Sequence, residues 1–303
     1  MKVVVTGATG FVGRALVPAL TAAGHQVTAL TRSASHAVGL GSARIVETEL
    51  ENATALAPIL DGQDAIIHLA GERLDRRRWD ARQKQILRDS RVESTRALVE
   101  ALASLPSRPA VLVHASGIDY YGYASGPLDD DDVTEADPPG ESFLSRLCRD
   151  WEGEAAAATP LGVRVVHMRM GLILGPGGGA LARMQTPFKL FAGGKIGSGK
   201  QWVSWIHRDD AVAAYLAALT DARYTGAINL VTDSTRNAEL SAALGRALHR
   251  PSWLPVPAFA LKAAVGELAE SILNGRKAVP AKLRDLGFTW KHPTLDDAVA
   301  ASL

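Results

Sequence analysis

Cysteine is almost absent from the sequence, because Cys148 is the only one among 303 residues. This absence excludes an intramolecular disulfide framework and a cysteine-rich zinc site, and it suits a reducing compartment. The simplest expectation is therefore a cytoplasmic protein. The histidines are scattered without metal-ligand spacing, so we also expect no metal site.

A long apolar run is missing as well. The first apolar stretch, of about six residues, is broken at Gly7 and is too short for a secretory or membrane-spanning segment. Charge of one sign is not in excess either, since the chain has 33 basic and 32 acidic residues. Because no net charge creates a strong electrostatic field around the protein, we expect neither nucleic acid nor a membrane surface as a partner.

The remaining composition is that of an ordinary globular enzyme. Hydrophobic residues make up 47% of the chain, and its length allows a substantial core. A small-molecule substrate is the expected partner, and both a monomer and a homodimer stay open.

Apolar, strand-like runs alternate with longer amphipathic segments in the first half of the chain. The runs are KVVVTG, HQVTALTR, DAIIHLAG, AVLVHAS and VRVVHMRM, beginning at residues 2, 25, 64, 110 and 163. Amphipathic segments cover residues 13–24 and 80–105. Strands separated by helices imply right-handed crossovers and a parallel sheet covered on both faces. The pattern predicts an α/β fold, a Rossmann-type doubly wound parallel sheet.

The alternation fades after residue 175 into the glycine-rich stretch GPGGGALARM. A short strand-like run then leads into a helix. From Asn237 onward the pattern is mostly helical, and prolines separate the helical segments. We therefore expect a main domain over residues 1–175, to which residues 203–235 return. Residues 176–202 and 236–303 would form a smaller, mostly helical substrate region.

The stretch VTGATGFVG has a GxxGxxG spacing directly after the first predicted strand, where it opens the first helix. Glycines let the backbone turn tightly and approach a pyrophosphate, whose charge the free amides and the helix dipole stabilise. Strand, loop and helix agree, so we expect a dinucleotide to bind the main domain here. The loop residues assigned to it are Gly7, Thr9, Gly10, Phe11, Val12 and Gly13.

The end of the second strand indicates which dinucleotide binds. A site selective for NAD usually places a carboxylate there for the ribose 2′-hydroxyl, whereas this chain has Thr31, Arg32 and Ser33. Arg32 can pair with a 2′-phosphate through its planar, charged fork. The sequence therefore predicts NADP(H) in preference to NAD(H), unless Arg32 is simply a surface arginine.

Further motifs carry a family resemblance: HLAG from residue 68, SRVESTRALVEAL from 90, DYYG from 119, CRDWE from 148 and GSGKQWVSWIH from 197. With them the chain resembles an extended or atypical short-chain dehydrogenase/reductase, more narrowly the epimerase-like family of the 39U type. The tail AVPAKLRDLGFTWKHPTLDDAV is similar to that family's small C-terminal domain. The resemblance implies further cofactor contacts from Leu69, Ala70, Gly71, Glu72, Arg91 and Ile173.

The catalytic pair of the wider superfamily is missing. That superfamily uses a serine, a tyrosine and a lysine four residues later to move a proton while the cofactor exchanges hydride. The corresponding helix reads ESFLSRLCRDWEGEA, without tyrosine or lysine, and the usual serine register holds Gly117, with Ser116 one residue earlier. The possible tyrosine and lysine registers hold Phe143, Leu144, Leu147 and Cys148.

Residues that could take over proton transfer from the missing pair lie in HASGIDYYG, residues 114–122. The candidate catalytic residues are Ser116, Asp119, Tyr120 and Tyr121. Each tyrosine could exchange a proton, contact substrate or pack, and Asp119 could be an acid or base or only stabilise a turn. Two functions follow: an NADP(H)-dependent oxidoreductase or epimerase for a small polar substrate, or a non-catalytic NADP(H)-binding sensor. Whether the protein is an enzyme stays open.

Overall fold

The computed structural model describes residues 1–123 and 130–303. A seven-stranded sheet forms its centre, in the order β10-β7-β5-β4-β1-β2-β3, and every pairing in it is parallel. The strands are β1 (Lys2–Thr6), β2 (Gln26–Thr31), β3 (Arg44–Glu47), β4 (Ala65–His68), β5 (Val111–Gly117), β7 (Arg164–Met170) and β10 (Gly226–Leu230). The predicted doubly wound parallel sheet is confirmed.

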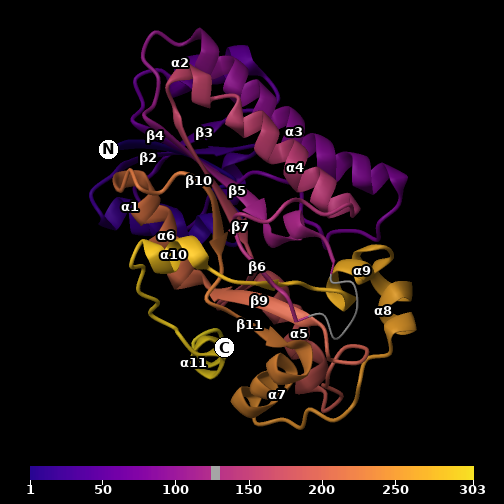
Figure 1. The fold of residues 1–303 in the computed structure, drawn as a ribbon. Helices are drawn as coiled ribbons and strands as arrows, with labels where there is room; N and C mark the ends of the chain where they lie inside the picture. Colours follow the sequence, from indigo (N-terminus) through magenta and orange to yellow (C-terminus); the bar gives the residue numbers. More distant parts are fainter. Residues whose placement is uncertain (124–129) are drawn as a thin grey trace.

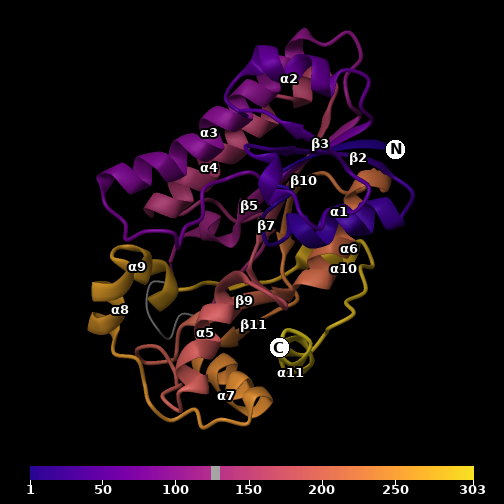
Figure 2. The same cartoon turned by 180° about the vertical axis from the view of Figure 1, so that it is seen from behind.

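Helices cover both faces of this sheet (Figures 1 and 2). One face carries α1 (Gly13–Ala22) and α6 (Arg208–Thr220); the other carries α2 (Ala53–Leu60), α3 (Ala81–Ser104) and α4 (Phe143–Ala156). Successive strand residues serve opposite faces, as a pleated strand requires. Val3 and Val5 join the α1 core, for example, while Val4 joins the α3 core.

Side-chain caps explain where three of these helices begin. Asn52 accepts a hydrogen bond from the Ala55 N–H at the start of α2. Asp80 and Ser142 accept equivalent bonds at the first turns of α3 and α4. Each bond satisfies a backbone donor that the helix itself leaves unpaired.

A second, smaller layer lies against the carboxyl ends of the main strands. It contains a three-stranded sheet of β8 (Leu172–Leu174), β9 (Trp202–His207) and β11 (Asp233–Arg236), and the strand pair β6 (Asp132–Val133) with β12 (Lys277–Ala278). Its helices are α5 (Gly179–Lys189), α7 (Asn237–Leu248), α8 (Ala258–Val265), α9 (Leu268–Leu273) and α11 (Leu295–Ala300). The returning segment 203–235 is thus shared, because α6 and β10 pack in the main layer while β9 and β11 lie in the smaller one.

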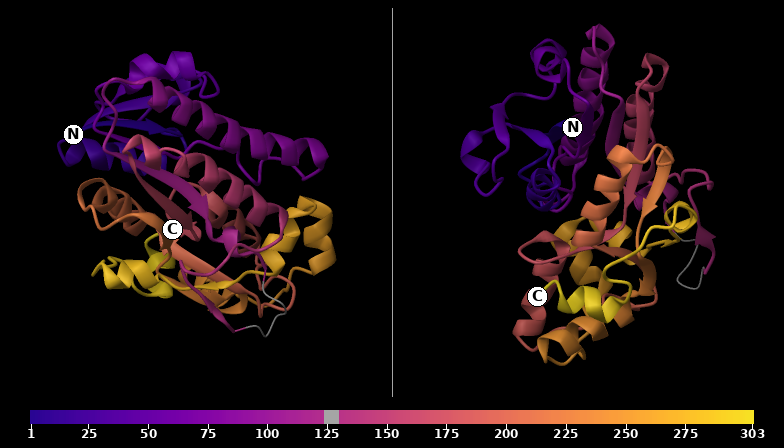
Figure 3. Two further views of the ribbon diagram at one scale, coloured as in Figure 1. Left: turned by 45° about the horizontal axis from the view of Figure 1, so that its top comes forward. Right: turned by 90° about the vertical axis from the view of Figure 1, so that its left-hand side faces the viewer.

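The C-terminal tail spans both layers (Figure 3). Leu283 of α10 (Ala281–Asp285) is buried in the core between the main sheet and α1, whereas Val299 of α11 is buried in the smaller layer. The tail therefore fixes the position of one layer against the other. No helix in the described part of the chain is both long and apolar enough to cross a membrane.

Candidate functional site

The loop between β1 and α1 requires glycine at its tight points. Gly7 has a φ of +66°, and a Cβ there would lie 2.7 Å from the carbonyl carbon of Leu69. A Cβ at Gly13 would lie 2.4 Å from the carbonyl oxygen of Gly7. A side chain at Gly7 would push the loop away from the end of β4, and one at Gly13 would push the start of α1 away from the loop.

The N-terminus of α1 is open to an anion. Its N-cap residue, Val12, makes no side-chain capping bond, and the first turn holds no acidic residue. The first backbone N–H groups of a helix lack intrahelical partners, and its dipole favours negative charge there. The residues at this end therefore fit a pyrophosphate: Gly7, Thr9, Gly10, Phe11, Val12 and Gly13.

The end of β2 presents a cation and hydroxyl groups. Arg32 is exposed, and its guanidinium makes no hydrogen bond or ion pair within the described part of the chain. Thr31 and Ser33 bond to each other at its base. Arg14 donates to two carbonyls of residues 36–38, at 2.7 and 2.8 Å, and so holds the following segment against the glycine loop. This surface fits a phosphate group on the ribose.

A second glycine-rich segment, residues 175–179, crosses the phosphate-binding loop. Cβ atoms built on three of its glycines would lie between 2.9 and 3.3 Å from ring atoms of Phe11. Arg208 lies over the same ring, 5.0 Å from its centroid, and donates to the Pro176 carbonyl at 2.8 Å. The glycines therefore allow this segment to close on Phe11, beside the N-terminus of α1.

The segment after β4 runs from the glycine loop to α3. The Ala70 N–H donates to Thr6 at 3.2 Å, and the Glu72 N–H donates to Ser90 at 3.0 Å. The predicted cofactor residues Leu69, Ala70, Gly71 and Glu72 thus form one continuous edge beside that loop. Ile173 lies in β8, where it is half-buried and pairs with a residue of β9, and it packs against the same core cluster as Leu69.

Arg91 brings positive charge to this edge. Its Cζ atom lies 3.0 Å from the position of a Cβ on Gly71 and 5.2 Å from the ring centroid of Trp151. Burial lowers the pKa of Arg91, and the nearby charges of Glu72 and Asp119 oppose that shift. The structure therefore brings two of the predicted cofactor residues, Glu72 and Arg91, near a predicted catalytic one.

Ser116 lies at the end of β5, and its side chain is hydrogen-bonded. Its hydroxyl donates to Glu152 of α4 at 2.6 Å. The Glu152 carboxylate also accepts two bonds from Arg169 of β7, both at 2.9 Å, and this ion pair is buried. Two parallel bonds of this kind hold a guanidinium in one orientation. Ser116 is therefore part of a buried polar network.

Arg169 also contacts both predicted tyrosines. It donates to the Tyr121 hydroxyl at 2.9 Å, and that hydroxyl donates to Asn229 of β10 at 2.6 Å. Burial raises the pKa of Tyr121 to about 12, against the opposing effect of Arg169. Tyr120 stacks on the same guanidinium, whose central carbon lies 3.4 Å from the ring centroid. The Tyr121 phenol is therefore held neutral near pH 7.

Asp119 lies beside the position that the Cβ of a serine at the usual register would take. Its Oδ2 lies 3.5 Å from the position of a Cβ on Gly117, and the sulfur of Cys148 lies 3.7 Å from the same position. Its Oδ1 accepts a hydrogen bond from Ser271 of α9 at 2.8 Å. Burial raises the pKa of Asp119, although the Ser271 bond and Arg91 act in the opposite direction.

The helix that should carry tyrosine and lysine packs as an apolar element. Leu144 and Leu147 are buried with Trp79 and with Leu268 of α9. Phe143 meets the Trp79 ring edge-on, with centroids 5.6 Å apart. Cys148 is the last of the four possible tyrosine and lysine positions. Burial raises the pKa of its thiol to about 12, so the thiol is neutral. α4, all of which the structure describes, thus offers no phenol or ammonium to the site.

The contacts that four residues make in this site were not predicted from the sequence: Glu152, Arg169, Asn229 and Ser271. Glu152 stood in the motif CRDWE, which carried the family resemblance, and Arg169 in the strand-like run VRVVHMRM, yet nothing indicated that they pair with each other. Ser271 is 152 residues from Asp119, so no local spacing could connect the two. These contacts depend on how α9 and β10 pack.

Two family profiles match consecutive parts of the chain. The NAD dependent epimerase/dehydratase family matches residues 3–230, and a domain of unknown function, DUF1731, matches residues 256–302. The chain is 42% identical over 311 residues to "Epimerase family protein SDR39U1 homolog, chloroplastic" of Arabidopsis thaliana, covering 99% of this chain and 86% of that protein. It is 34% identical to the epimerase family protein YfhF of Bacillus subtilis, covering 99% and 97%.

Solved structures agree with these matches. The human epimerase family protein SDR39U1, isoform 2, was solved with NADPH; it has a TM-score of 0.87 and 32% identity, over 99% of this chain and 98% of that one. A nucleoside-diphosphate sugar epimerase from Corynebacterium glutamicum has a TM-score of 0.79 and 32% identity. That likeness covers all of this chain but 58% of the other.

Proposed function

Because the chain belongs to the NAD dependent epimerase/dehydratase family, we propose that it is an NADP(H)-dependent oxidoreductase or epimerase acting on a small polar substrate. The substrate would bind between the carboxyl edge of the main sheet and the smaller layer, where ligands of such sheets usually bind. One observation carries the proposal: the carboxyl group of Asp119 lies over Gly117 with a raised pKa, near Arg91.

NADP(H) is the proposed cofactor because the residues of both subsites fit it. The glycine loop and the open end of α1 suit a pyrophosphate, and Arg32, which has no partner in the described segments, offers its guanidinium to a 2′-phosphate. The human relative was solved with NADPH, which supports the same choice. When bound, the cofactor supplies or accepts a hydride.

Asp119 is proposed to hold the proton that accompanies this hydride. Because burial raises its pKa, the carboxyl stays protonated to a higher pH than a free aspartic acid. Ser271 fixes Oδ1, which leaves Oδ2 to donate a proton to a substrate oxygen or to accept one. The positive charge of Arg91 would then stabilise the carboxylate that remains.

The other three candidates are assigned supporting parts. The Tyr121 hydroxyl is bound to Arg169 and Asn229 and has a pKa of about 12, which makes it a poor base near pH 7. The Ser116 hydroxyl is bound to Glu152. Tyr120, stacked on Arg169, is proposed as a wall against which substrate lies.

The test compares Asp119→Asn with Tyr121→Phe in a screen for NADPH oxidation by aldehydes, ketones and nucleotide sugars. General acid–base catalysis typically contributes 10² to 10⁴ in rate, so Asp119→Asn should lower kcat by roughly a hundredfold or more. NADPH affinity, measured by fluorescence titration, should stay unchanged. Tyr121→Phe keeps the ring packing and should lose less than about tenfold in kcat.

Two results would contradict the proposal. Full turnover by Asp119→Asn would remove the proton-transfer role from that carboxyl. Tight NADPH binding without turnover of any carbonyl compound or nucleotide sugar would argue against an enzyme altogether.

That second result would favour a non-catalytic, NADP(H)-binding sensor. One observation supports this alternative: the possible tyrosine and lysine registers of α4 hold residues packed with α3 and α9, such as Leu144 and Leu147. If the protein is a sensor, the Asp119→Asn variant should bind NADPH as tightly as the wild type. The protein should also bind a partner only when the cofactor is present.

A further inference from the structure

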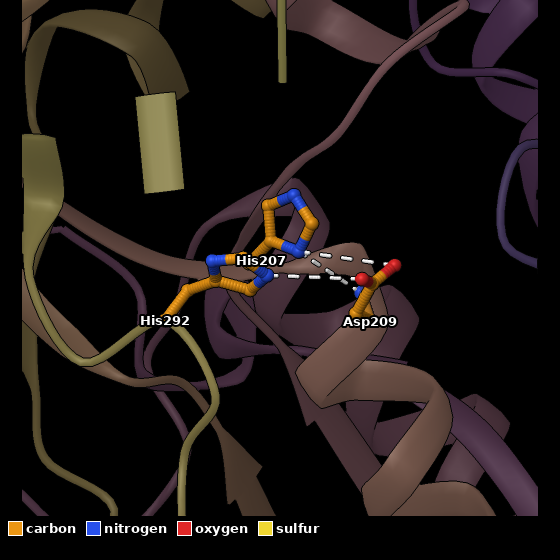
Figure 4. Close-up of side chains that lie close together, drawn as sticks. All are labelled: His207, Asp209 and His292. Carbon is orange, nitrogen blue, oxygen red and sulfur yellow. Dashed lines mark hydrogen bonds and ion pairs between the residues drawn. The ribbon is translucent and has the colours of Figure 1, made fainter. Parts of the chain in front are cut away.

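Three potential metal ligands from two distant segments meet where α6 begins. His207 ends β9, and Asp209 lies in the first turn of α6. His292 comes from the tail, between α10 and α11. Figure 4 shows a ring nitrogen of each histidine directed toward the Asp209 carboxylate. The sequence predicted no metal site because these residues have no regular spacing along the chain.

The tail holds His292 in this position by its backbone. Asp210 is 1% exposed, and its carboxylate accepts hydrogen bonds from the N–H groups of Lys291 at 2.6 Å and of His292 at 3.1 Å. Trp290 packs against the core of the main layer. The imidazole of His292 is therefore placed beside β9 independently of any bond that its own ring makes.

The three side chains offer their donor atoms at short range. Nδ1 of His207 is 4.0 Å from Oδ1 of Asp209, and Nε2 of His292 is 3.7 Å from Oδ2. The three donor atoms all lie within 4.8 Å of one another. Donors of a tetrahedral Zn²⁺ site, with bonds of 2.0–2.1 Å, are about 3.4 Å apart, so only small rotations are needed.

We propose that His207, Asp209 and His292 bind one divalent transition-metal ion, with Zn²⁺ as the best match. Two imidazoles and one carboxylate are a common ligand set for this ion, with a water in the fourth position. Asp209 is 43% exposed, so the side of the site near its carboxylate is open to that water. The ion would fasten the C-terminal tail to β9 and α6.

The surroundings of the histidines suit an ion better than a hydrogen bond. Nε2 of His292 is buried and has no hydrogen-bond partner among the residues that the structure describes, since 3.7 Å to the carboxylate is too long for one. His207 is 1% exposed, and the centroid of its ring lies 3.9 Å from that of His292, so the two imidazoles are held close together.

Two present contacts would be exchanged for the metal. Lys291 Nζ lies 2.8 Å from Oδ2 of Asp209, and the Asp209 N–H donates to Nδ1 of His207 at 3.1 Å. The Lys291 side chain is 68% exposed and can leave without cost in packing. Because its ammonium competes with a cation for Asp209, Lys291→Gln should bind metal more tightly than the wild type.

The experiment titrates Zn²⁺, and Co²⁺ as a spectroscopic probe, into the chelator-treated full chain. We expect one ion per chain, a visible Co²⁺ spectrum of low coordination number and a higher Tm with metal. His292→Gln and Asp209→Asn should each weaken binding by about tenfold or more. Lys291→Gln should strengthen it, and His36→Gln, which removes an exposed imidazole elsewhere, should leave it unchanged.

Saturable binding with this order of affinities would establish the site. The absence of saturable binding by the wild type would overturn the proposal, and so would equal affinities for the wild type and both ligand variants. Circular dichroism checks that the variants fold, and exposed Asp209 makes Asp209→Asn the safer of the two. The outcome depends neither on NADP(H) nor on Asp119, so it stands apart from the proposed function.

Discussion

The carboxyl group of Asp119 and the thiol of Cys148 both lie beside Gly117, the position at which the resemblance leads us to expect a serine. The sequence showed that no tyrosine or lysine occurs in residues 143–156. It could not show how Asp119 is placed, since its carboxyl group is held by a hydrogen bond from Ser271, far along the chain. Single residues that act through long-range contacts cannot be predicted from local spacing.

Arg32 gives the residue-scale prediction. Its charged hydrogen bonds to a 2′-phosphate should contribute about 1.5–3 kcal/mol, so Arg32→Ala should weaken NADPH binding roughly ten- to a hundredfold. NADH lacks that phosphate and should lose less than about twofold. Fluorescence titration of both cofactors measures the difference. Arg44→Ala, at another exposed arginine on the edge of the sheet, is the matched control. If Arg32→Ala lowered the affinities for NADPH and NADH equally, the predicted preference for NADP(H) would be wrong.

At the scale of elements, buried strands were predicted and edge elements were not. The five apolar runs all became strands of the main sheet, because a parallel strand covered on both faces must be continuously apolar. β3 is one of the two edge strands, and its side chains are half-buried or exposed, so its sequence ARIVET carries no such run. Strands β8 and β11 are also too short to show a pattern.

The junction of α4 and β7 gives the element-scale prediction. Glu152→Gln leaves the buried Arg169 charge uncompensated, which should reduce the free energy of unfolding by about 3–5 kcal/mol. Glu154→Gln on the same helix breaks a more exposed pair with Arg96 and should cost less than about 1 kcal/mol. Urea denaturation near pH 7 compares the two. Similar losses would show that the buried pair has no special part in fixing α4 to the sheet.

At the scale of the whole molecule, the main sheet carries a row of buried histidines. His68, His114 and His167 stand at one register of β4, β5 and β7, on the side of the sheet that α3 and α4 cover. Burial lowers the pKa of His68 to about 4, lowers that of His114 well below its usual value and lowers that of His167 against the field of Glu152. All three are therefore neutral in the fold near pH 7.

This row predicts an acid-labile protein. Below pH 6.5 the unfolded chain takes up protons on these histidines, whereas the folded chain, in which all three pKa values are lowered, resists uptake. His68 resists it until the pH approaches about 4. Stability should therefore be complete above pH 6.5 and fall as the pH drops toward 4, by up to roughly 1.4 kcal/mol per pH unit for each histidine. Neither ring nitrogen of His114 makes a hydrogen bond to residues 1–123 or 130–303, so His114→Leu, of similar volume, should remove one such contribution.

Urea denaturation at pH 7.5, 6 and 5 measures this slope. His114→Leu should stay within about 1.5 kcal/mol of the wild type at pH 7.5, because the two side chains have similar volumes, and should lose less stability on acidification. His36→Gln removes an exposed imidazole and should keep the wild-type slope. The same slope for all three proteins would mean that carboxyl groups, not the histidine row, set the acid limit of the fold.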